Sequence, residues 1–188
     1  MYEILVKKDL TPTITMMEVS APRLAASAQP GQFLIVRTDE NGERVPLTVC
    51  DYDKERGSVT IVTQKVGASS RKICALEQGE SFQDVSGPLG RPSEFVGLSD
   101  EEIKQKRFIF IAGGLGTAPV YPQAKYLYSR GAKVDIIVGA KSADMLILEE
   151  EMSKVCDNLY ICTDDGSKGM KGLVTEKLAQ LCEAGQKY

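Results

Sequence analysis

A glycine-rich segment, AGGLGTAP at residues 112–119, has the residue types and spacing to bind a phosphate group. It follows an apolar, strand-like run and precedes a helix-like run, so its glycines would lie where a parallel strand leads into a helix. Glycines let the backbone approach a ligand closely, and the free N–H groups at a helix start favour a pyrophosphate. The alternative is a tight turn without a ligand. The flanking runs are those that dinucleotide binding requires, so nucleotide binding is the favoured interpretation.

The same segment departs from the usual dinucleotide fingerprint. Pro119 stands where the third glycine of GxGxxG would be. The next strand-like run, IIVGAKS, ends in Gly139, Ala140 and a lysine, whereas an adenosine ribose is usually held by an acidic residue at this point. These departures argue against a classical dehydrogenase.

A third segment, CTDDGSKGMKG at residues 162–172, follows another strand-like run. Ligands of open α/β sheets bind at the carboxyl edge of the sheet, where this segment would lie. Asp164 and Asp165 could therefore hydrogen-bond sugar or amide groups of the same nucleotide. An Asp-Gly turn with solvated carboxylates is the alternative.

The segment RVPLTVCD at residues 44–51 places an arginine two residues before a proline, at the head of a strand-like run. On its own it indicates a strand entry, because proline is tolerated at the first residue of a strand and a flanking arginine is usually solvated.

Composition narrows the chemistry that these segments can support. The 188 residues carry a net charge of -3 with a pI near 5.2, which argues against a nucleic-acid partner. No run has the length of a signal peptide core or a membrane span, so we expect a cytoplasmic protein without a membrane partner. The five cysteines contain no CxxC and there is no histidine, so neither a metal site nor a catalytic triad is indicated. A bound cofactor would have to supply the chemistry.

Elements that could position these segments differ between the two halves of the chain. Up to about residue 98, short β-rich runs alternate with turn signals such as QPGQ and KERG, which predicts an antiparallel sandwich or barrel with one helix over residues 69–76. From about residue 104, buried strands alternate with helices, including one expected over residues 142–155 with Ser142 as its cap, which predicts a doubly wound parallel sheet. We therefore expect two domains, at residues 1–98 and 104–188.

Taken together, RVPLT, VGASSRKI and GPLG, followed by GGLGTAP and TDDGSKGMKG, resemble the ferredoxin–NADP reductase superfamily. Within it, the chain is similar to the flavin subunits of NADH-dependent reduced ferredoxin:NADP oxidoreductases, also known as sulfide dehydrogenase subunits, and to the electron-transfer subunits of dihydroorotate dehydrogenases. The five motifs occur in the family's order over essentially the whole chain. The resemblance implies a Greek-key barrel that binds FAD and an α/β domain that binds NAD(H) or NADP(H).

The resemblance also implies roles for individual residues. In the family, the arginine of the first motif pairs with FAD phosphate, and the residues that follow line the isoalloxazine near its reactive nitrogen. These positions are Arg44, Pro46, Leu47 and Thr48, with Thr48 at the catalytic position. An arginine fork suits a phosphate, and a short hydroxyl can hydrogen-bond a ring nitrogen without blocking hydride approach.

The remaining implied cofactor contacts belong to later motifs. A second flavin segment opens the short helix of the first half with Gly67, Ser69 and Ser70, and Gly87 and Gly90 bound the loop near the flavin. In the second half the implied nicotinamide contacts are Gly114, Gly116, Thr117, Pro119, Gly139, Ala140 and Asp165.

The implied partners are a larger flavin or iron–sulfur subunit and ferredoxin. Relatives of this kind continue past the last residue of this chain and carry a cysteine cluster for a [2Fe–2S] centre. None of the five cysteines here has that spacing, so we expect a truncated chain that has a [2Fe–2S] centre only if a further C-terminal segment supplies it. The resemblance thus implies an FAD-containing electron-transfer subunit that exchanges hydride with a nicotinamide dinucleotide. Two other functions fit the motifs: a stand-alone NAD(P)H:flavin reductase and a non-catalytic nucleotide-binding module.

Overall fold

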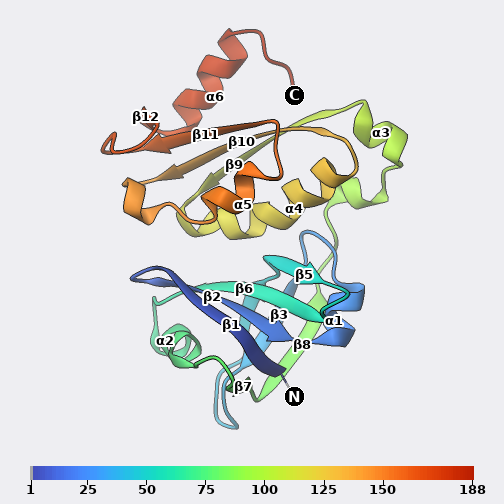
Figure 1. Ribbon diagram of the computed structural model, residues 1–188, viewed down its shortest axis with the longest axis vertical. Coiled ribbons are helices and arrows are strands. Elements are labelled where there is room, and N and C mark those ends of the chain that lie inside the picture. Colours follow the sequence, from blue (N-terminus) through green and yellow to red (C-terminus); the bar gives the residue numbers. More distant parts are fainter. Residues whose placement is uncertain (1) are drawn as a thin grey trace. The chain divides into compact units, whose positions relative to one another are not determined.

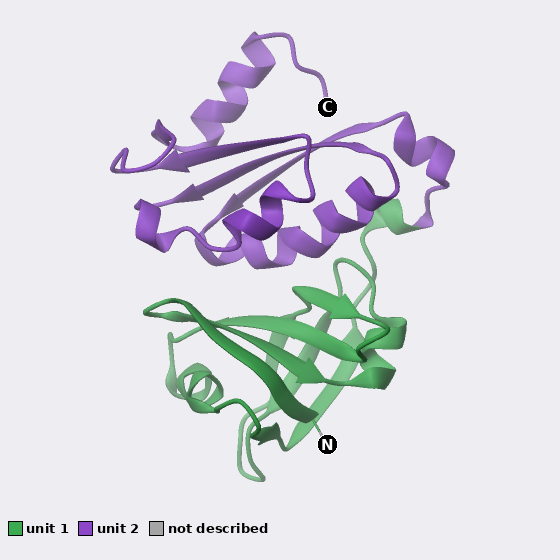
Figure 2. Cartoon of the chain, viewed as in Figure 1, with its two compact units in different colours: residues 1–96 green, residues 97–188 purple. Residues whose placement is uncertain are grey.

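The computed structural model describes residues 2–188 and divides the chain into two compact units, residues 1–96 and 97–188 (Figure 2). Unit 1 is built from antiparallel strands and unit 2 around a parallel sheet. The predicted fold class, an antiparallel β domain followed by a parallel α/β domain, is confirmed.

Unit 1 consists of two antiparallel sheets and two short helices (Figure 1). The first sheet has the order β5-β6-β2-β1-β7, and its strands are β1 (Tyr2–Thr11), β2 (Ile14–Ser20), β5 (Asp51–Asp53), β6 (Ser58–Gln64) and β7 (Ser81–Phe82). The second has the order β4-β3-β8, with strands β3 (Phe33–Arg37), β4 (Val45–Thr48) and β8 (Asp84–Leu89). The helices are α1 (Pro22–Ser27) and α2 (Ala68–Ala75).

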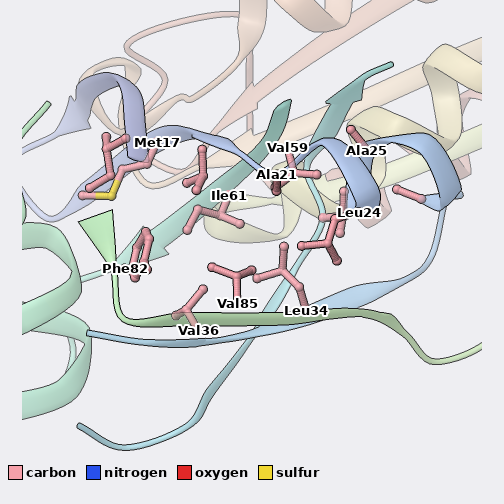
Figure 3. Close-up of a cluster of buried hydrophobic side chains, with 14 of the residues drawn as sticks. Met17, Ala21, Leu24, Ala25, Leu34, Val36, Val59, Ile61, Phe82 and Val85 are labelled. Atoms are coloured by element: carbon pink, nitrogen blue, oxygen red, sulfur yellow. The ribbon is translucent and has the colours of Figure 1, made fainter. Parts of the chain in front are cut away.

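One apolar core joins the two sheets of unit 1 (Figure 3). Met17 and Ile61 enter it from the first sheet, Leu34 and Val85 from the second, and Leu24 from α1. Side chains alternate across a strand, so each strand that sends one residue inward presents the next one outward. The core therefore fixes which residues of the second sheet lie on its outer face.

Unit 2 is a four-stranded parallel sheet in the order β12-β11-β10-β9. Helices α4 and α5 lie on one face and α6 on the other (Figure 1). The elements are α3 (Asp100–Lys104), β9 (Arg107–Gly113), α4 (Thr117–Ser129), β10 (Lys133–Ala140), α5 (Glu149–Ser153), β11 (Asn158–Thr163), β12 (Met170–Lys171) and α6 (Val174–Glu183), with 3-10 turns at Gly114–Gly116 and Ala143–Met145. A further 3-10 turn, Glu94–Gly97, spans the boundary between the units in the sequence. Strands β9, β10 and β11 end at the same edge of the sheet, because Gly113, Gly139 and Cys162 are register neighbours.

The prediction of a single helix over residues 142–155 was wrong. A 3-10 turn at Ala143–Met145 is followed by the separate helix α5, and Ser142 makes no capping hydrogen bond. Between the two, Ile147 and Leu148 are buried, and Leu148 has a left-handed backbone with φ of 55°. Packing of these two apolar side chains thus overrides the helical propensity of the segment.

A buried carboxylate ties the amino edge of the parallel sheet together. Asp135 on β10 is 1% exposed and accepts hydrogen bonds from Arg107 Nη2 at 2.6 Å, Asn158 Nδ2 at 2.8 Å and the Tyr188 hydroxyl at 2.9 Å. The hydrogen bond to Asp135 raises the pKa of Arg107. Since these partners begin β9, begin β11 and follow α6, one side chain links three segments of unit 2.

Replacing Asp135 with alanine should lower the free energy of unfolding by about 3 kcal/mol, because the substitution leaves three polar groups without their acceptor. Urea unfolding monitored by circular dichroism measures the change. The control is Asp164→Ala, an exposed aspartate, which should change stability by less than about 0.5 kcal/mol. Equal effects of the two substitutions would contradict this role for Asp135.

Candidate functional site

The segment Arg44–Thr48 consists of β4 and the residue before it, and its side chains are divided between two environments. Val45 and Leu47 pack against the core of unit 1, whereas Arg44, Pro46 and Thr48 are exposed. The period of two along an extended backbone produces this division. The structure therefore brings the arginine, the proline and the threonine of the first motif together on one outward face.

Proline fits within β4 because this strand is at the edge of its sheet. Among the described residues β4 pairs only with β3, and Pro46 stands opposite Ile35. An edge strand has one side without ladder hydrogen bonds, so the missing N–H of proline costs little there. The same register places the aromatic side chain of Phe33, which is partly buried, opposite Thr48.

Arg44 contacts an acidic residue of β8, the strand at the opposite edge of the same sheet. Its Nη1 lies 3.3 Å from Asp84 Oδ2 on β8, with the two side chains 58% and 31% exposed. A guanidinium has five N–H donors, and this contact uses one nitrogen. Arg44 thus retains donors that could hold a further anion.

The second predicted flavin segment forms the start of α2. Gly67 is the N-cap residue, and the Ser70 hydroxyl accepts hydrogen bonds from the backbone N–H groups of Val66 at 3.0 Å and Gly67 at 2.9 Å. Ser70 is therefore engaged in capping the helix. The Ser69 hydroxyl instead donates a hydrogen bond to the carboxylate of Glu43, in the loop before Arg44.

A cavity of about 250 Å³ joins the two predicted flavin segments. One side is formed by the loop before β4 and the other by the start of α2, and the residues that line it are Thr38, Asn41, Gly42, Glu43, Val45, Ala68, Ser69, Lys72 and Ile73. Residues on both sides of Arg44 belong to this lining. The cavity therefore joins the loop before β4 to the start of α2, and of the predicted flavin contacts only Ser69 is part of its lining.

Predicted site glycines in unit 1 divide by what surrounds them. A Cβ built on Gly67 would meet no atom within 4 Å, so the protein's own packing does not require glycine at the start of α2. A Cβ on Gly87 would lie 3.0 Å from Leu24 and 3.1 Å from Leu34, and one on Gly90 would lie 3.0 Å from the ring of Phe33. Gly87 and Gly90 are thus explained by packing, while Gly67 leaves open space.

The glycine loop of unit 2 leaves open space throughout. A Cβ on Gly113, Gly114 or Gly116 would meet no atom within 4 Å, and Gly114 also has a positive φ of 52°. Thr117 follows at the start of α4; it is fully buried, and its hydroxyl has no hydrogen-bond partner among the described residues. Buried hydroxyls are nearly always satisfied, so an open loop beside an unsatisfied hydroxyl fits a bound ligand. Pro119 occupies the first turn of α4, where its missing N–H costs nothing.

The other predicted nucleotide contacts, Gly139, Ala140 and Asp165, lie at the same carboxyl edge of the sheet, and each has a structural role within unit 2. A Cβ on Gly139 would lie 2.5 Å from Val174 of α6, so glycine is needed there for packing. Ala140 ends β10, and its carbonyl accepts a hydrogen bond from the N–H of Asp164 at 3.1 Å. Asp165 accepts from the Ser167 hydroxyl at 2.6 Å and backbone N–H at 2.9 Å, and these bonds lower its pKa. The carboxylate of Asp165 thus stabilises its own turn.

The cysteines and acidic residues form no metal centre in the described part of the chain. Cys50, Cys74, Cys156 and Cys162 are buried free thiols, and Cys182 is exposed. Burial raises the pKa of Cys162, which favours the neutral thiol beside the nucleotide loop. The described residues also contain no helix long and apolar enough to cross a membrane.

Comparisons with known proteins agree with this arrangement, although no family model matches the chain. A Clostridium beijerinckii protein described as "Uncharacterized protein in adh 3'region" is 50% identical over 189 residues, covering 100% of this chain and 64% of the relative. A Thermotoga maritima protein named "Dihydroorotate dehydrogenase B (NAD(+)), electron transfer subunit homolog" is 36% identical over 179 residues, covering 95% of this chain and 61% of the relative.

Solved structures agree as well. The structure of an NADH-dependent reduced ferredoxin-NADP oxidoreductase, reported for flavin-based electron bifurcation, superposes with a TM-score of 0.86 at 34% identity, over 97% of this chain and 63% of the other. The resemblance to the ferredoxin–NADP reductase superfamily is confirmed. The Plasmodium falciparum ferredoxin-NADP+ reductase, at 15% identity and a TM-score of 0.74, shares the reductase fold. The chain spans less than two thirds of the length of the C. beijerinckii and T. maritima relatives and of the NADH-dependent oxidoreductase chain.

Within this reductase fold, sequence reasoning missed three residues of the candidate flavin site. Phe33 lies opposite Thr48, Asp84 contacts Arg44, and Glu43 contacts Ser69. Phe33 could have been found from the alternation along its strand, which puts it on the outer face. The two acidic contacts depend on long-range pairing and give no local signal.

Proposed function

We propose that the protein is the FAD-binding, electron-transfer subunit of an oxidoreductase. In this function, FAD exchanges hydride with NAD(H) or NADP(H) and passes electrons to an iron–sulfur centre or a partner subunit. The observation that carries the proposal is the meeting of two distant segments at one cavity: the end of the loop before β4 and the start of β4 contribute Glu43 and Val45, and the start of α2 contributes Ser69 and Lys72. Arg44 follows Glu43 directly and has an exposed side chain.

Residues of unit 1 suit the parts of FAD. Arg44 has free donors for a phosphate, and Gly67 with Ser69 leaves the start of α2 open to the same group. Pro46, Leu47 and Thr48 continue along β4, where Pro46 and Thr48 face outward and can line a flat ring. The Thr48 hydroxyl would hydrogen-bond the reactive ring nitrogen and hold a proton there. Ser70, Gly87 and Gly90 support this site through helix capping and packing.

Residues of unit 2 suit a nicotinamide dinucleotide. The backbone of Gly114 and Gly116 is open to a pyrophosphate, and the Thr117 hydroxyl lacks a partner that a ligand could provide. Gly139 and Ala140, at the end of β10 beside the glycine loop, would contact the same nucleotide. Asp165 would bind a sugar only after giving up its hydrogen bonds with Ser167. Pro119 fixes the first turn of the helix that carries this loop.

The partner is proposed to be a larger flavin or iron–sulfur subunit, with ferredoxin as a further electron carrier. The name of the T. maritima relative contains "electron transfer subunit", and the solved relative is an oxidoreductase of ferredoxin and NADP. A [2Fe–2S] centre in the full-length protein would require ligands beyond the described residues.

Replacing Arg44 with alanine should weaken FAD binding about 10- to 100-fold, because a charge-assisted pair with phosphate is lost. Titration of flavin fluorescence with the full-length apoprotein measures the affinity. The matched control is Arg56→Ala, since Arg56 is 53% exposed and pairs with Glu18 elsewhere in unit 1. An unchanged FAD affinity in Arg44→Ala would show that the segment is a strand entry with a solvated arginine and does not bind FAD.

Replacing Gly116 with valine should weaken binding of the nicotinamide dinucleotide about 10-fold and leave FAD affinity unchanged, because the added side chain fills the space open to the ligand. Titrations with NADH and with NADPH measure the effect and show which of the two binds more tightly. Gly97→Val is the control, because a Cβ at Gly97 also meets no atom within 4 Å. Similar losses in both variants would argue against a ligand at the loop.

A further inference from the structure

Two carboxylates of unit 1 contact the groups that are proposed to hold the FAD phosphates. Glu43 accepts a hydrogen bond from the Ser69 hydroxyl, and Asp84 lies 3.3 Å from Arg44. One contact is at the start of α2 and the other is on the outer face of the β4-β3-β8 sheet. Both halves of the phosphate site are therefore in contact with negative charge from the chain itself.

Glu43 takes a hydrogen bond that a phosphate oxygen would take. Its carboxylate contacts Ser69, and both residues line the 250 Å³ cavity. An anion near the first turn of a helix is stabilised by the free N–H groups and the helix dipole. The same physics that would favour phosphate at α2 thus favours the Glu43 carboxylate.

Asp84 makes the corresponding contact with Arg44. Its Oδ2 also accepts a hydrogen bond from the Ser86 hydroxyl at 3.3 Å, which holds the carboxylate on the outer face. In the sheet register Asp84 stands opposite Arg37, at the end of β3 nearest the loop that leads to Arg44. A phosphate that approaches Arg44 would therefore meet a carboxylate that already shares the guanidinium.

We propose that Glu43 and Asp84 set the affinity for FAD, because the pyrophosphate must displace the first from Ser69 and compete with the second for Arg44. This inference rests on the proposed function. Two carboxylates beside a pyrophosphate repel it, so the exchange lowers the affinity that the site would otherwise have.

The segment that carries this exchange is suited to move. Residues 42–44 have no regular secondary structure, and the Glu43 and Arg44 side chains are exposed. A change of side-chain rotamer in an exposed loop breaks no ladder hydrogen bond and costs little. Glu43 can leave α2 and Arg44 can turn to the phosphate while β4 stays paired with β3.

Glu43→Gln tests the first contact, because glutamine keeps the length and an acceptor for Ser69 but removes the charge. The variant should bind FAD about 3- to 10-fold more tightly than the wild-type full-length protein. Its affinity for riboflavin, which has no phosphate, should stay unchanged. The control is Glu40→Gln in the same loop, where the backbone carbonyl of Glu40 accepts from Arg37 at 3.3 Å and the residue lies outside the cavity lining.

Asp84→Asn tests the second contact and should also tighten FAD binding, with the two gains combining in the double variant. In the Arg44→Ala background, Asp84→Asn should give a smaller gain than in the wild type, because the part of its effect that acts through Arg44 is lost. Weaker or unchanged FAD binding in Glu43→Gln and Asp84→Asn would overturn the inference, as would an equal gain for riboflavin. Wild-type apoprotein that binds no FAD would instead refute the proposed function.

Discussion

The alternation of side chains along β4 is the constraint on which the candidate flavin site depends. Val45 and Leu47 are held inward by the core of unit 1, so Pro46 and Thr48 must face outward, and Arg44 is exposed directly before the strand. No local interaction of these three residues is needed to place them. The apolar core of unit 1 fixes the register of an edge strand, and that strand then presents a proline and a hydroxyl on its outer face, directly after the arginine.

Open space beside glycine is the second recurring feature. Gly67 in unit 1 and Gly113, Gly114 and Gly116 in unit 2 have no neighbour that a side chain would strike, whereas Gly87, Gly90 and Gly139 do. Packing thus explains the second group of glycines but not the first. Both open groups lie at the start of a helix, where N–H groups are available to a phosphate. The two proposed nucleotide sites thus share one feature, open backbone at the start of a helix.

Sequence patterns predicted the features that depend on local periodicity. The strands of both halves, the helix at residues 68–75 and the strand–glycine–helix order around residue 114 follow from alternation, apolar runs and turn residues. The helix at residues 100–104 was missed although Ser99 and Glu102 form a capping box that the sequence displays. The break before Glu149 was missed because the packing of Ile147 and Leu148 is a tertiary effect. Contacts of Arg44 and Ser69 with acidic residues could not be foreseen, since they depend on how distant segments pair.

Hydride transfer from a nicotinamide to the flavin can be followed in the absorption spectrum of the FAD-loaded full-length protein under anaerobic conditions, before and after addition of NADH or NADPH. The expected result is an oxidised flavin spectrum that bleaches with at least one of the two nicotinamides, since unit 1 is proposed to bind the flavin and unit 2 the hydride donor. A protein that takes up FAD but shows no bleaching with either nicotinamide would contradict it.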